Sequence, residues 1–442
     1  MAARSLLRRG GAGWALPRAP QPEVTAPTDR RMEIPLTDVA DSATEKFDLN
    51  GGDLLPAGEF YRANDELRAR HRWYWNDIGP GYWVLTRYQD VRDAFHASEL
   101  FSNQSITPVE PHPKYRFLPS HIDPPEHIKY RTPLLRWLSP KAVEGHSGFI
   151  RQTANELIDR FIDDGQVEFQ GAFAEQLPAL LLTHLLALPR SDWSFFRDCA
   201  LRLRDTVSHA GEQGTALSAM ADLKSYFAVV LEDYQVNPRD PATDLIASLL
   251  DARIDDRHFD REEVLDFLMT MAFGSLDTTK SVMSLAMWHL ATHPPDREWV
   301  ARDASIIPSA LEELLRAYPI VSMGRKVTRD VEFAGCPMAK GDMVMLNQYS
   351  ANRDPEAFDH PDEVRLDRGQ NRHVAFGASE HRCAGSHLAR AELQIVLEEW
   401  HRRIPVYRLA DGAEVRARSS HIERLDLVWT SDRSGCPTVG DQ

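Results

Sequence analysis

The sequence predicts a mainly α fold, a helix-rich body with a small antiparallel β region. From about residue 144 to residue 250, apolar residues recur at helical spacing and prolines separate the successive helices. A longer helix is predicted over 262–293, and its first half is apolar nearly all round, which is typical of a helix buried inside a protein. Strand patterns do not alternate with helix patterns, so the order of elements argues against a doubly wound α/β fold.

The remaining elements follow from local signals. A turn at Gly79-Pro80-Gly81 separates two aromatic strands, Pro319 ends one helix, and Pro405 ends another. Shorter helices are expected over 90–97, 307–317 and 384–404. Strands are expected over 73–75, 82–86, 325–328, 331–334, 343–346, 414–416 and 424–429.

The N-terminal segment differs in composition from the rest of the chain. Residues 1–45 are rich in proline, alanine and arginine, and we expect them to lack fixed structure, which leaves 46–442 as one domain. Residues 1–22 contain arginine but no acidic residue, as organelle transit segments do. We favour a disordered tail, or a true start near Met32, over a transit segment.

Composition narrows the function classes. A net charge of −15 argues against non-specific nucleic-acid binding. The four cysteines are far apart and form no CxxC pair, so a disulfide framework or a zinc site is not expected, and a reducing cytoplasm fits. The most apolar run, 177–189, is too short to span a membrane. We therefore expect a cytoplasmic protein that binds neither nucleic acid nor membrane.

The stretch that organises the chain is FGASEHRCAG at 376–385. Cys383 falls just before the helix predicted over 384–404, where free N–H groups and the positive end of the helix dipole favour a thiolate. A thiolate held in a turn beside an aromatic ring is a suitable axial ligand for haem iron. The alternative for an isolated cysteine is a buried structural thiol.

Phe376, Gly377, His381, Cys383 and Gly385 stand at the positions of the haem-binding loop of the cytochrome P450 family. The chain resembles this family of haem-thiolate monooxygenases over roughly residues 45–430. The resemblance implies a single domain that binds haem b (iron protoporphyrin IX) through Cys383 and inserts one oxygen atom from O2 into a substrate.

One position in the loop departs from the family pattern. Ser379 stands where the family usually has a second glycine. If that position needs a positive φ, the serine carries strain of about 1 kcal/mol. The departure therefore concerns the geometry of the loop more than the identity of the ligand.

A polar patch, Gly274-Ser275-Leu276-Asp277-Thr278, interrupts the long apolar helix. A threonine can donate to a carbonyl one turn earlier and open the helix, and a carboxylate beside a hydroxyl can deliver protons. The resemblance assigns Asp277 and Thr278 to the family's catalytic acid–alcohol pair. The alternative is a polar pair satisfied within the helix, and Lys280, three residues beyond Asp277, favours it.

Glu313 and Arg316 place opposite charges three residues apart on one helix face. Such a pair on a protein surface contributes only a few tenths of a kcal/mol (about 0.2–0.5). The resemblance implies that Arg368 joins this pair and that the three residues have a structural role, fixing the segment that leads to Cys383.

Haem carries two propionates, which need cationic or hydrogen-bonding partners. The resemblance assigns this role to His127, Arg131, Arg325 and His381, whereas each residue taken alone would suit a solvated surface. Because no reductase module is present in the sequence, we expect electrons from a [2Fe-2S] ferredoxin and its ferredoxin reductase. The basic residues that could receive an acidic ferredoxin are Lys129, Arg131, Arg136, Arg382 and Arg390.

Within the family, the chain is similar to the camphor-hydroxylating type of soluble bacterial enzyme. The similarity places a substrate-anchoring phenol at Tyr115, where the alternative is an ordinary loop aromatic. Met323 replaces an aspartate of that type, which makes the pocket mouth more apolar. The further substrate contacts expected by position are Phe117, Thr270, Phe273, Gly274 and Val321.

We therefore expect a monomeric monooxygenase that hydroxylates a small apolar substrate, of terpenoid type. Peroxide-driven oxidation by the same haem is a second possibility, but that branch of the family usually lacks the acid–alcohol pair. A haem-based sensor is a third, and the sequence shows no appended DNA-binding or signalling module.

Overall fold

The computed structural model describes residues 43–49, 52–207 and 213–430. The predicted disordered tail, 1–45, lies almost wholly outside this part of the chain. Its last two residues, Thr44–Glu45, form strand β1, which pairs with β3 (Trp73–Asn76). Ordered structure therefore begins slightly before the predicted boundary at residue 46, because these backbone groups extend a sheet.

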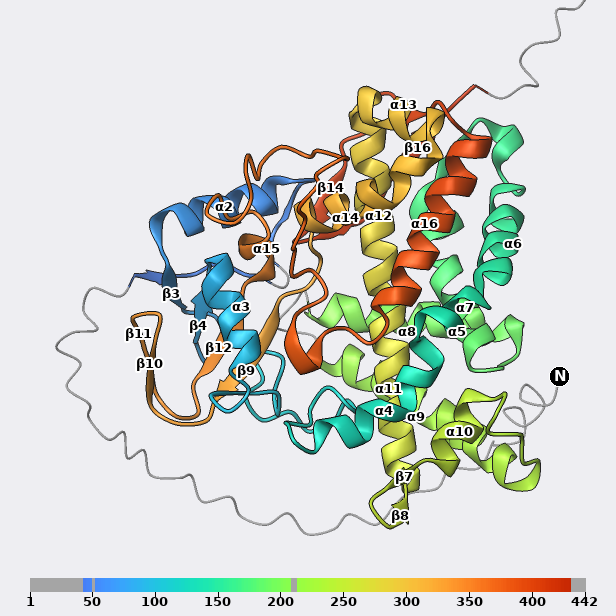
Figure 1. Ribbon diagram of the computed structural model, residues 1–442. Coiled ribbons are helices and arrows are strands. Elements are labelled where there is room, and N and C mark those ends of the chain that lie inside the picture. The colour runs from blue at the N-terminus through green and yellow to red at the C-terminus, as the bar shows by residue number, and fades with distance from the viewer. Residues whose placement is uncertain (1–42, 50–51, 208–212, 431–442) are drawn as a thin grey trace, which may run out of the picture. The chain divides into compact units, whose positions relative to one another are not determined.

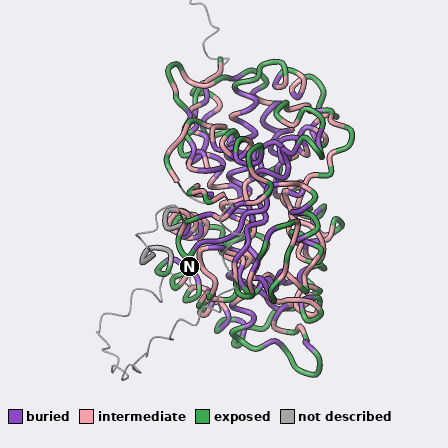
Figure 2. Tube along the Cα trace, turned by 90° about the vertical axis from the view of Figure 1, so that its left-hand side faces the viewer, coloured by how far each residue is buried: buried purple, intermediate pink, exposed green. Residues whose placement is uncertain are grey.

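Helices make up most of the structure, as predicted, and long helices surround the central pair α11 and α12 (Figure 1). The long helices are α4 (His127–Leu138), α6 (Ser147–Ile158), α7 (Gln176–Leu185), α8 (Trp193–Val207), α9 (Gln213–Val236), α11 (Arg261–Ser275), α12 (Asp277–Thr292), α14 (Ile307–Ala317) and α16 (Ser386–Arg403). The shorter ones are α2 (Glu59–Arg70), α3 (Tyr88–His96), α5 (Pro140–Glu144), α10 (Leu245–Asp251), α13 (Pro294–Arg302) and α15 (Gln348–Ala351). Figure 2 shows that the buried positions concentrate along the inside of this body. Among the helices of the described residues, none combines the length and the apolar character that crossing a membrane requires.

The main sheet has six strands in the order β1-β3-β4-β12-β9-β5. Besides β1 and β3, its strands are β4 (Tyr82–Leu85), β5 (Phe101–Ser102), β9 (Met323–Val327) and β12 (Met343–Leu346). The predicted β region is small, as expected, but it is not purely antiparallel. β1 with β3 and β4 with β12 pair in parallel, and Val344 lies opposite Trp83. Local turn signals could not reveal a pairing between segments so far apart in the chain.

Two three-stranded sheets contain the strands nearest the C-terminus. One joins β15 (His421–Ile422), β14 (Arg416–Arg418) and β2 (Leu54–Pro56), and the other joins β13 (Arg408–Leu409), β16 (Asp426–Val428) and β6 (Gln166–Glu168). The remaining strand pairs are the hairpins β7–β8 (Arg253–Ile254 with Arg257–His258) and β10–β11 (Val331–Phe333 with Cys336–Met338).

The long helix predicted over 262–293 is divided at Leu276. α11 ends at Ser275 and α12 begins at Asp277, with Leu276 at φ −81° and ψ −66° between them. The hydroxyl of Thr278 donates to the carbonyl of Gly274 at 2.7 Å, and that of Ser275 donates to Met271 at 2.7 Å. Side-chain hydroxyls that compete for helix carbonyls account for the break, as the sequence suggested for Thr278.

The carboxylate of Glu313 is the centre of a buried polar cluster. Glu313 and Arg316 are both completely buried and share two hydrogen bonds of 2.8 Å. Arg368 donates to the same carboxylate at 2.9 Å, Asn371 at 3.0 Å, and the backbone N–H of Arg365 at 2.9 Å. The structure thus joins Glu313, Arg316 and Arg368 as predicted, and it ties the long coil after α15 to α14.

Replacing Glu313 with alanine should remove the carboxylate from this cluster and leave Arg316 and Arg368 with backbone carbonyls alone as acceptors. We expect the free energy of unfolding to fall by about 3–5 kcal/mol. Burial alone would raise the pKa of Glu313, but Arg316 and Arg368 hold it below its usual value. The contribution of the Glu313 carboxylate to the free energy of unfolding is therefore present near neutral pH, and it is lost as the pH falls through the lowered pKa of this group.

Urea unfolding at neutral and acidic pH measures both effects. The matched control is Asp411→Ala, which removes an exposed i,i+3 ion pair. The side chain of Asp411 is 90% exposed and that of its partner Arg408 is 57% exposed. That change should cost less than about 1 kcal/mol. Equal losses for the two variants would contradict the structural role assigned to Glu313.

Candidate active site

The loop that carries Cys383 is a tight turn between the coil and α16. The backbone N–H of Cys383 donates to the carbonyl of Phe376 at 2.8 Å, and Gly377 has a φ of 69°. The guanidinium of Arg390 lies over the Phe376 ring, 4.4 Å from its centre. α16 begins at Ser386, two residues after the predicted start, so Cys383 precedes the helix as expected.

Ser379 adopts a φ of 58°, which is the left-handed conformation that the family's usual glycine would adopt without strain. The serine at this position therefore has the positive φ that the family's usual glycine led us to expect. The loop keeps its turn, and the serine bears strain of about 1 kcal/mol.

Burial raises the pKa of the Cys383 thiol, although part of the residue is exposed. The backbone N–H of Gly385 and the guanidinium of Arg131 act in the opposite direction without reversing the shift. The protein groups alone therefore do not favour the thiolate that the helix terminus predicted. A cation bound at sulfur would, since a metal deprotonates a coordinating thiol outright. This chemistry fits iron as the partner of Cys383.

Residues of α14 and α15 hold the loop in position. Two of them, Glu312 and Gln348, were not predicted from the sequence. Arg390 donates to Glu312 at 2.6 and 2.9 Å, and His373 contacts Glu312 at 3.1 Å. Burial opposes ionisation, but these partners lower the pKa of Glu312 to about 2. Gln348 donates to the carbonyl of Val374 at 2.6 Å. Adjacent glutamates on α14 thus fix the segments on both sides of Cys383.

The four residues predicted to hold the haem propionates come together beside this loop. The rings of His127 and His381 lie 4.0 Å apart, and the Nε2 atoms of both are buried with no hydrogen-bond partner in the part of the chain that the structure describes. Arg325 is 3% exposed, and among the described residues its one hydrogen-bond acceptor is the neighbouring carbonyl of Gly324, at 2.7 Å. Arg131 donates to the carbonyl of Arg382.

This group of four, called the basic cluster below, is electrostatically unbalanced. Burial, assisted by neighbouring arginines, lowers the pKa of His127 to about 4 and that of His381 to about 2. Burial also lowers the pKa of Arg325 to about 10, against a weaker opposing effect of Asp123. Buried donors without partners and excess positive charge are what a ligand with two carboxylates would satisfy.

Asp277 lies at the break between α11 and α12 and is paired on two sides. His421 contacts its carboxylate at 2.8 Å, and Lys280 lies 3.5 Å away. Burial would raise the pKa of Asp277, but His421 and Lys280 together hold it far below its usual value. The pairing with Lys280 that the sequence offered as an alternative is therefore present, and His421 is a partner that no sequence pattern indicated.

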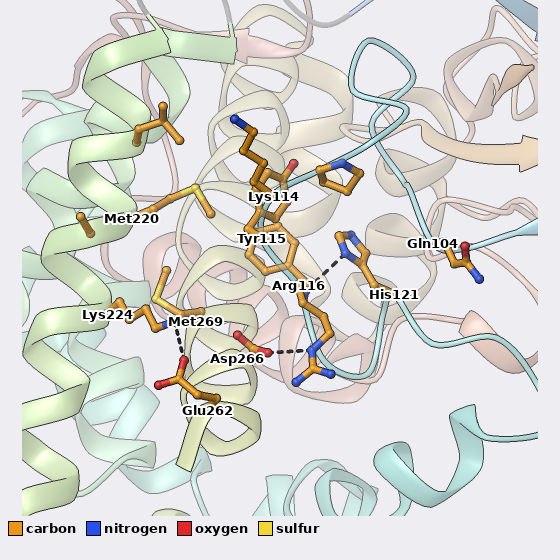
Figure 3. A pocket seen from close by; sticks show the side chains of 14 residues that line it. Gln104, Lys114, Tyr115, Arg116, His121, Met220, Lys224, Glu262, Asp266 and Met269 are labelled. Atoms are coloured by element: carbon orange, nitrogen blue, oxygen red, sulfur yellow. Dashed lines mark hydrogen bonds and ion pairs between the residues drawn. The ribbon is translucent and has the colours of Figure 1, made fainter. Parts of the chain in front are cut away.

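A pocket of about 650 Å³ lies between the loop at 113–121, α9 and α11 (Figure 3). Tyr115 and Phe117 line it, as predicted. The phenol of Tyr115 donates to Glu110 at 2.5 Å, so it already has a partner. Phe273 does not line the pocket, but its ring stacks on Phe117 at 4.8 Å. The other predicted contacts that lie outside the lining are Thr270, Gly274, Val321 and Met323.

Charged residues also line this pocket, which the prediction of an apolar site did not include. Arg116 pairs with Asp266 at 2.8 Å, and Lys224 pairs with Glu262 at 2.6 Å (Figure 3). The two pairs connect the loop and α9 to α11. The apolar part of the lining includes Leu217, Met220, Ala221 and Met269.

Comparison with known proteins places the chain among relatives of this architecture. A sequence profile described as cytochrome P450 matches residues 194–298 and 305–403. A probable cytochrome P450 127A1 from Sinorhizobium fredii is 31% identical, with 79% of this chain and 84% of that protein covered. A methyl-branched lipid omega-hydroxylase from Mycobacterium tuberculosis is 30% identical, with 90% and 96% covered.

Solved structures of cytochromes P450 are similar to this chain in fold. The crystal structure of CYP101J2 has a TM-score of 0.79 at 29% identity and covers 88% of this chain and 97% of its own. That of cytochrome P450 CYP101C1 has a TM-score of 0.78 at 29% identity, with the same coverage.

Fold and comparisons together define a bacterial-type oxygenase that uses haem. The chain belongs to the cytochrome P450 family and is a monooxygenase, which uses O2, an apolar substrate and haem b. The predicted family, fold class and cofactor are thereby confirmed.

Proposed function

We propose that this monooxygenase binds haem through Cys383 and the basic cluster and hydroxylates a small apolar substrate of terpenoid type. Its electrons come from a separate [2Fe-2S] ferredoxin and reductase. The observation that carries the proposal is the basic cluster: the buried, unpartnered Nε2 atoms of His127 and His381 lie beside two arginines and close to a cysteine loop. Two propionates would supply the missing acceptors.

Thiolate-bound haem supplies the oxygen chemistry, because the thiolate pushes electron density toward the iron and favours cleavage of the O–O bond. The chain supplies the surroundings of the sulfur. The backbone N–H of Gly385 donates toward the Cys383 sulfur, and the Phe376 ring, held by Arg390, forms part of the loop beside it. Hydrogen bonds to a ligand sulfur tune the metal that it binds.

Asp277 and Thr278 handle protons in this proposal. The Thr278 hydroxyl donates a hydrogen bond to the carbonyl of Gly274, so its oxygen remains free to accept a hydrogen bond from another group. His421 and Lys280 hold the pKa of Asp277 far below its usual value, so in this proposal Asp277 takes up a proton only when these contacts are released. Presence of this pair favours the O2-dependent reaction over peroxide-driven oxidation.

The redox partner meets the protein on the side of Arg131 in this proposal. Of the basic residues assigned to the docking face, Arg382 is exposed and Arg136 donates to the carbonyl of Ala242. Lys129 is paired with Glu126 and Asp255, each at 3.0 Å, and Arg390 is engaged by Glu312. Arg131, Arg136 and Arg382 are therefore the contacts expected for an acidic ferredoxin. We still predict that the protein is a monomer and that it lies in the cytoplasm.

The apolar part of the pocket lining supports a hydrocarbon substrate, and the names of relatives such as the methyl-branched lipid omega-hydroxylase are compatible with one. Tyr115 anchors a substrate oxygen by exchanging its hydrogen bond to Glu110 for one to the ligand. This exchange makes the gain smaller than for a free phenol, because an existing bond is lost.

Thr278→Ala should leave substrate binding intact but lower the product formed per electron pair, by tenfold or about 1.4 kcal/mol if protonation becomes limiting. Hydrogen peroxide should be released instead. Product and peroxide are measured against reduced cofactor consumed, with camphor as the probe.

The control is Thr292→Ala, because Thr292 donates to the carbonyl of Trp288 in the same way, at 2.9 Å, at the other end of α12. If both variants retain wild-type coupling, Thr278 has only a structural role.

Tyr115→Phe should weaken an oxygenated ligand by about 1 kcal/mol or less and leave the parent hydrocarbon nearly unaffected. Titration of a ketone and its parent hydrocarbon, camphor and bornane, by the shift of the haem absorption measures this difference. Tyr130→Phe is the control, since its hydroxyl donates to Glu263 at 3.0 Å and does not line the pocket. Equal losses for the two ligands would remove Tyr115 from the recognition contact.

A further inference from the structure

Two histidines from neighbouring helices meet at the surface of the helical body, and neither has a part in the site described above. His146 immediately precedes α6, His184 lies in the last turn of α7, and these two helices pack against each other. The Nδ1 atom of His146 lies 3.3 Å from the Nε2 atom of His184. His146 is half-buried and His184 is exposed, so ions in the solvent can reach the pair. The two residues are 38 positions apart in the chain, and no local sequence pattern connects them.

The distance between these two nitrogens matches the ligand spacing of a tetrahedral metal ion. At zinc, with Zn–N bonds of about 2.0–2.1 Å and tetrahedral angles, two histidine nitrogens lie about 3.3–3.4 Å apart. Ligands at right angles around a square-planar or octahedral ion would lie only about 2.8–3.0 Å apart at similar bond lengths. A hydrogen-bonded N–H group prefers its acceptor at about 2.9–3.0 Å, so the observed spacing is long for a direct contact between the rings. The spacing therefore favours a tetrahedral ion shared by the two histidines.

The packing around the pair holds both rings in place. The ring of His184 stacks on that of Phe149, with the ring centres 3.8 Å apart and the planes inclined by 6°. The backbone N–H of His146 donates to the carbonyl of Val143, and its carbonyl accepts from the N–H of Ile150, each at 3.0 Å. Because the ligands are already positioned, binding an ion costs little further conformational entropy.

Both imidazoles are in the form that binds metals. Burial lowers the pKa of His146 and of His184, and His146 lowers that of His184 further. Near neutral pH the rings are therefore neutral, and metal binding needs no prior loss of a proton. Arg190 lies over the Phe149 ring, 5.9 Å from its centre, but Glu156 engages its guanidinium. This arginine therefore adds little uncompensated positive charge to oppose a bound cation.

We propose that His146 and His184 form a zinc site that joins the start of α6 to the end of α7. His146 binds through Nδ1 and His184 through Nε2, and each ring carries its proton on its other nitrogen, so no electron is transferred and no proton is released. In the part of the chain that the structure describes, no cluster of three or more histidine, cysteine or acidic ligands is present, so water fills the remaining positions. The site is open and binds zinc more weakly than a structural site with four protein ligands. It does not depend on the proposed function.

The first test is isothermal titration calorimetry of the ferric holoprotein with Zn²⁺. His146→Gln and His184→Gln should each weaken binding at least about tenfold, because even changes to groups that merely orient a metal ligand cost roughly that much. The double variant should bind little more weakly than either single variant, because one histidine alone no longer chelates the ion. His258→Gln, at an exposed position in the β7–β8 hairpin, is the control and should bind as the wild type does.

The second test is urea unfolding of the same holoprotein with and without Zn²⁺. An ion that binds only the folded chain stabilises it, so zinc should raise the unfolding midpoint of the wild type and EDTA should reverse the rise. Mg²⁺ should leave the midpoint unchanged, because it prefers oxygen ligands. His146→Gln and His184→Gln should lose the zinc-dependent rise. Each variant is compared with its own midpoint without zinc, so a small loss of stability from the substitution does not obscure the result.

Equal zinc affinity in the wild type and in both single variants would overturn the proposal. So would a wild-type midpoint that does not respond to zinc at any concentration that leaves the protein soluble. If His258→Gln alone abolished the response, the zinc would lie at the β7–β8 hairpin, and the assignment to His146 and His184 would be wrong.

Discussion

The rest of the site depends on two neighbouring carboxylates of α14. Glu313, buried with Arg316, gathers Arg368, Asn371 and the backbone of Arg365, and so fixes a coil that has little regular structure of its own. Glu312 binds Arg390 on α16 and His373 on the coil. Because charged hydrogen bonds in a buried setting tolerate little displacement, these contacts set where Cys383 lies relative to α12.

The site contains polar groups in two contrasting states. Asp277 is surrounded by partners, and His421 and Lys280 hold its pKa far below its usual value. His127 and Arg325 are buried and His381 is half-buried, and the Nε2 atoms of both histidines have no hydrogen-bond partner among the described residues. Burying such groups is costly unless something pairs with them, so their arrangement indicates an anionic ligand. One side of the site is thus complete within the chain, and the other is complementary to a cofactor.

The sequence could predict what is local. The cysteine loop, the threonine that opens the helix, and the presence and type of most helices follow from residues close together in the chain. The degree of burial of the Glu313–Arg316 pair could not be predicted, because an i,i+3 pattern is the same on a surface. Glu312, His421 and the ion pairs around the pocket depend on contacts between distant segments, as does the parallel pairing of β4 with β12. An isolated histidine in a short hairpin carries no local signal of its partner.

The identity of the ligand residue is the centre of this account, and carbon monoxide tests it most directly. The reduced protein with carbon monoxide should absorb at the position typical of thiolate-bound haem, well to the red of a histidine-bound haem. Cys383→Ala should abolish that band, whereas alanine at the buried cysteines Cys199 and Cys336 should leave it unchanged. A band that persists in Cys383→Ala would show that another residue binds the iron and would contradict the account.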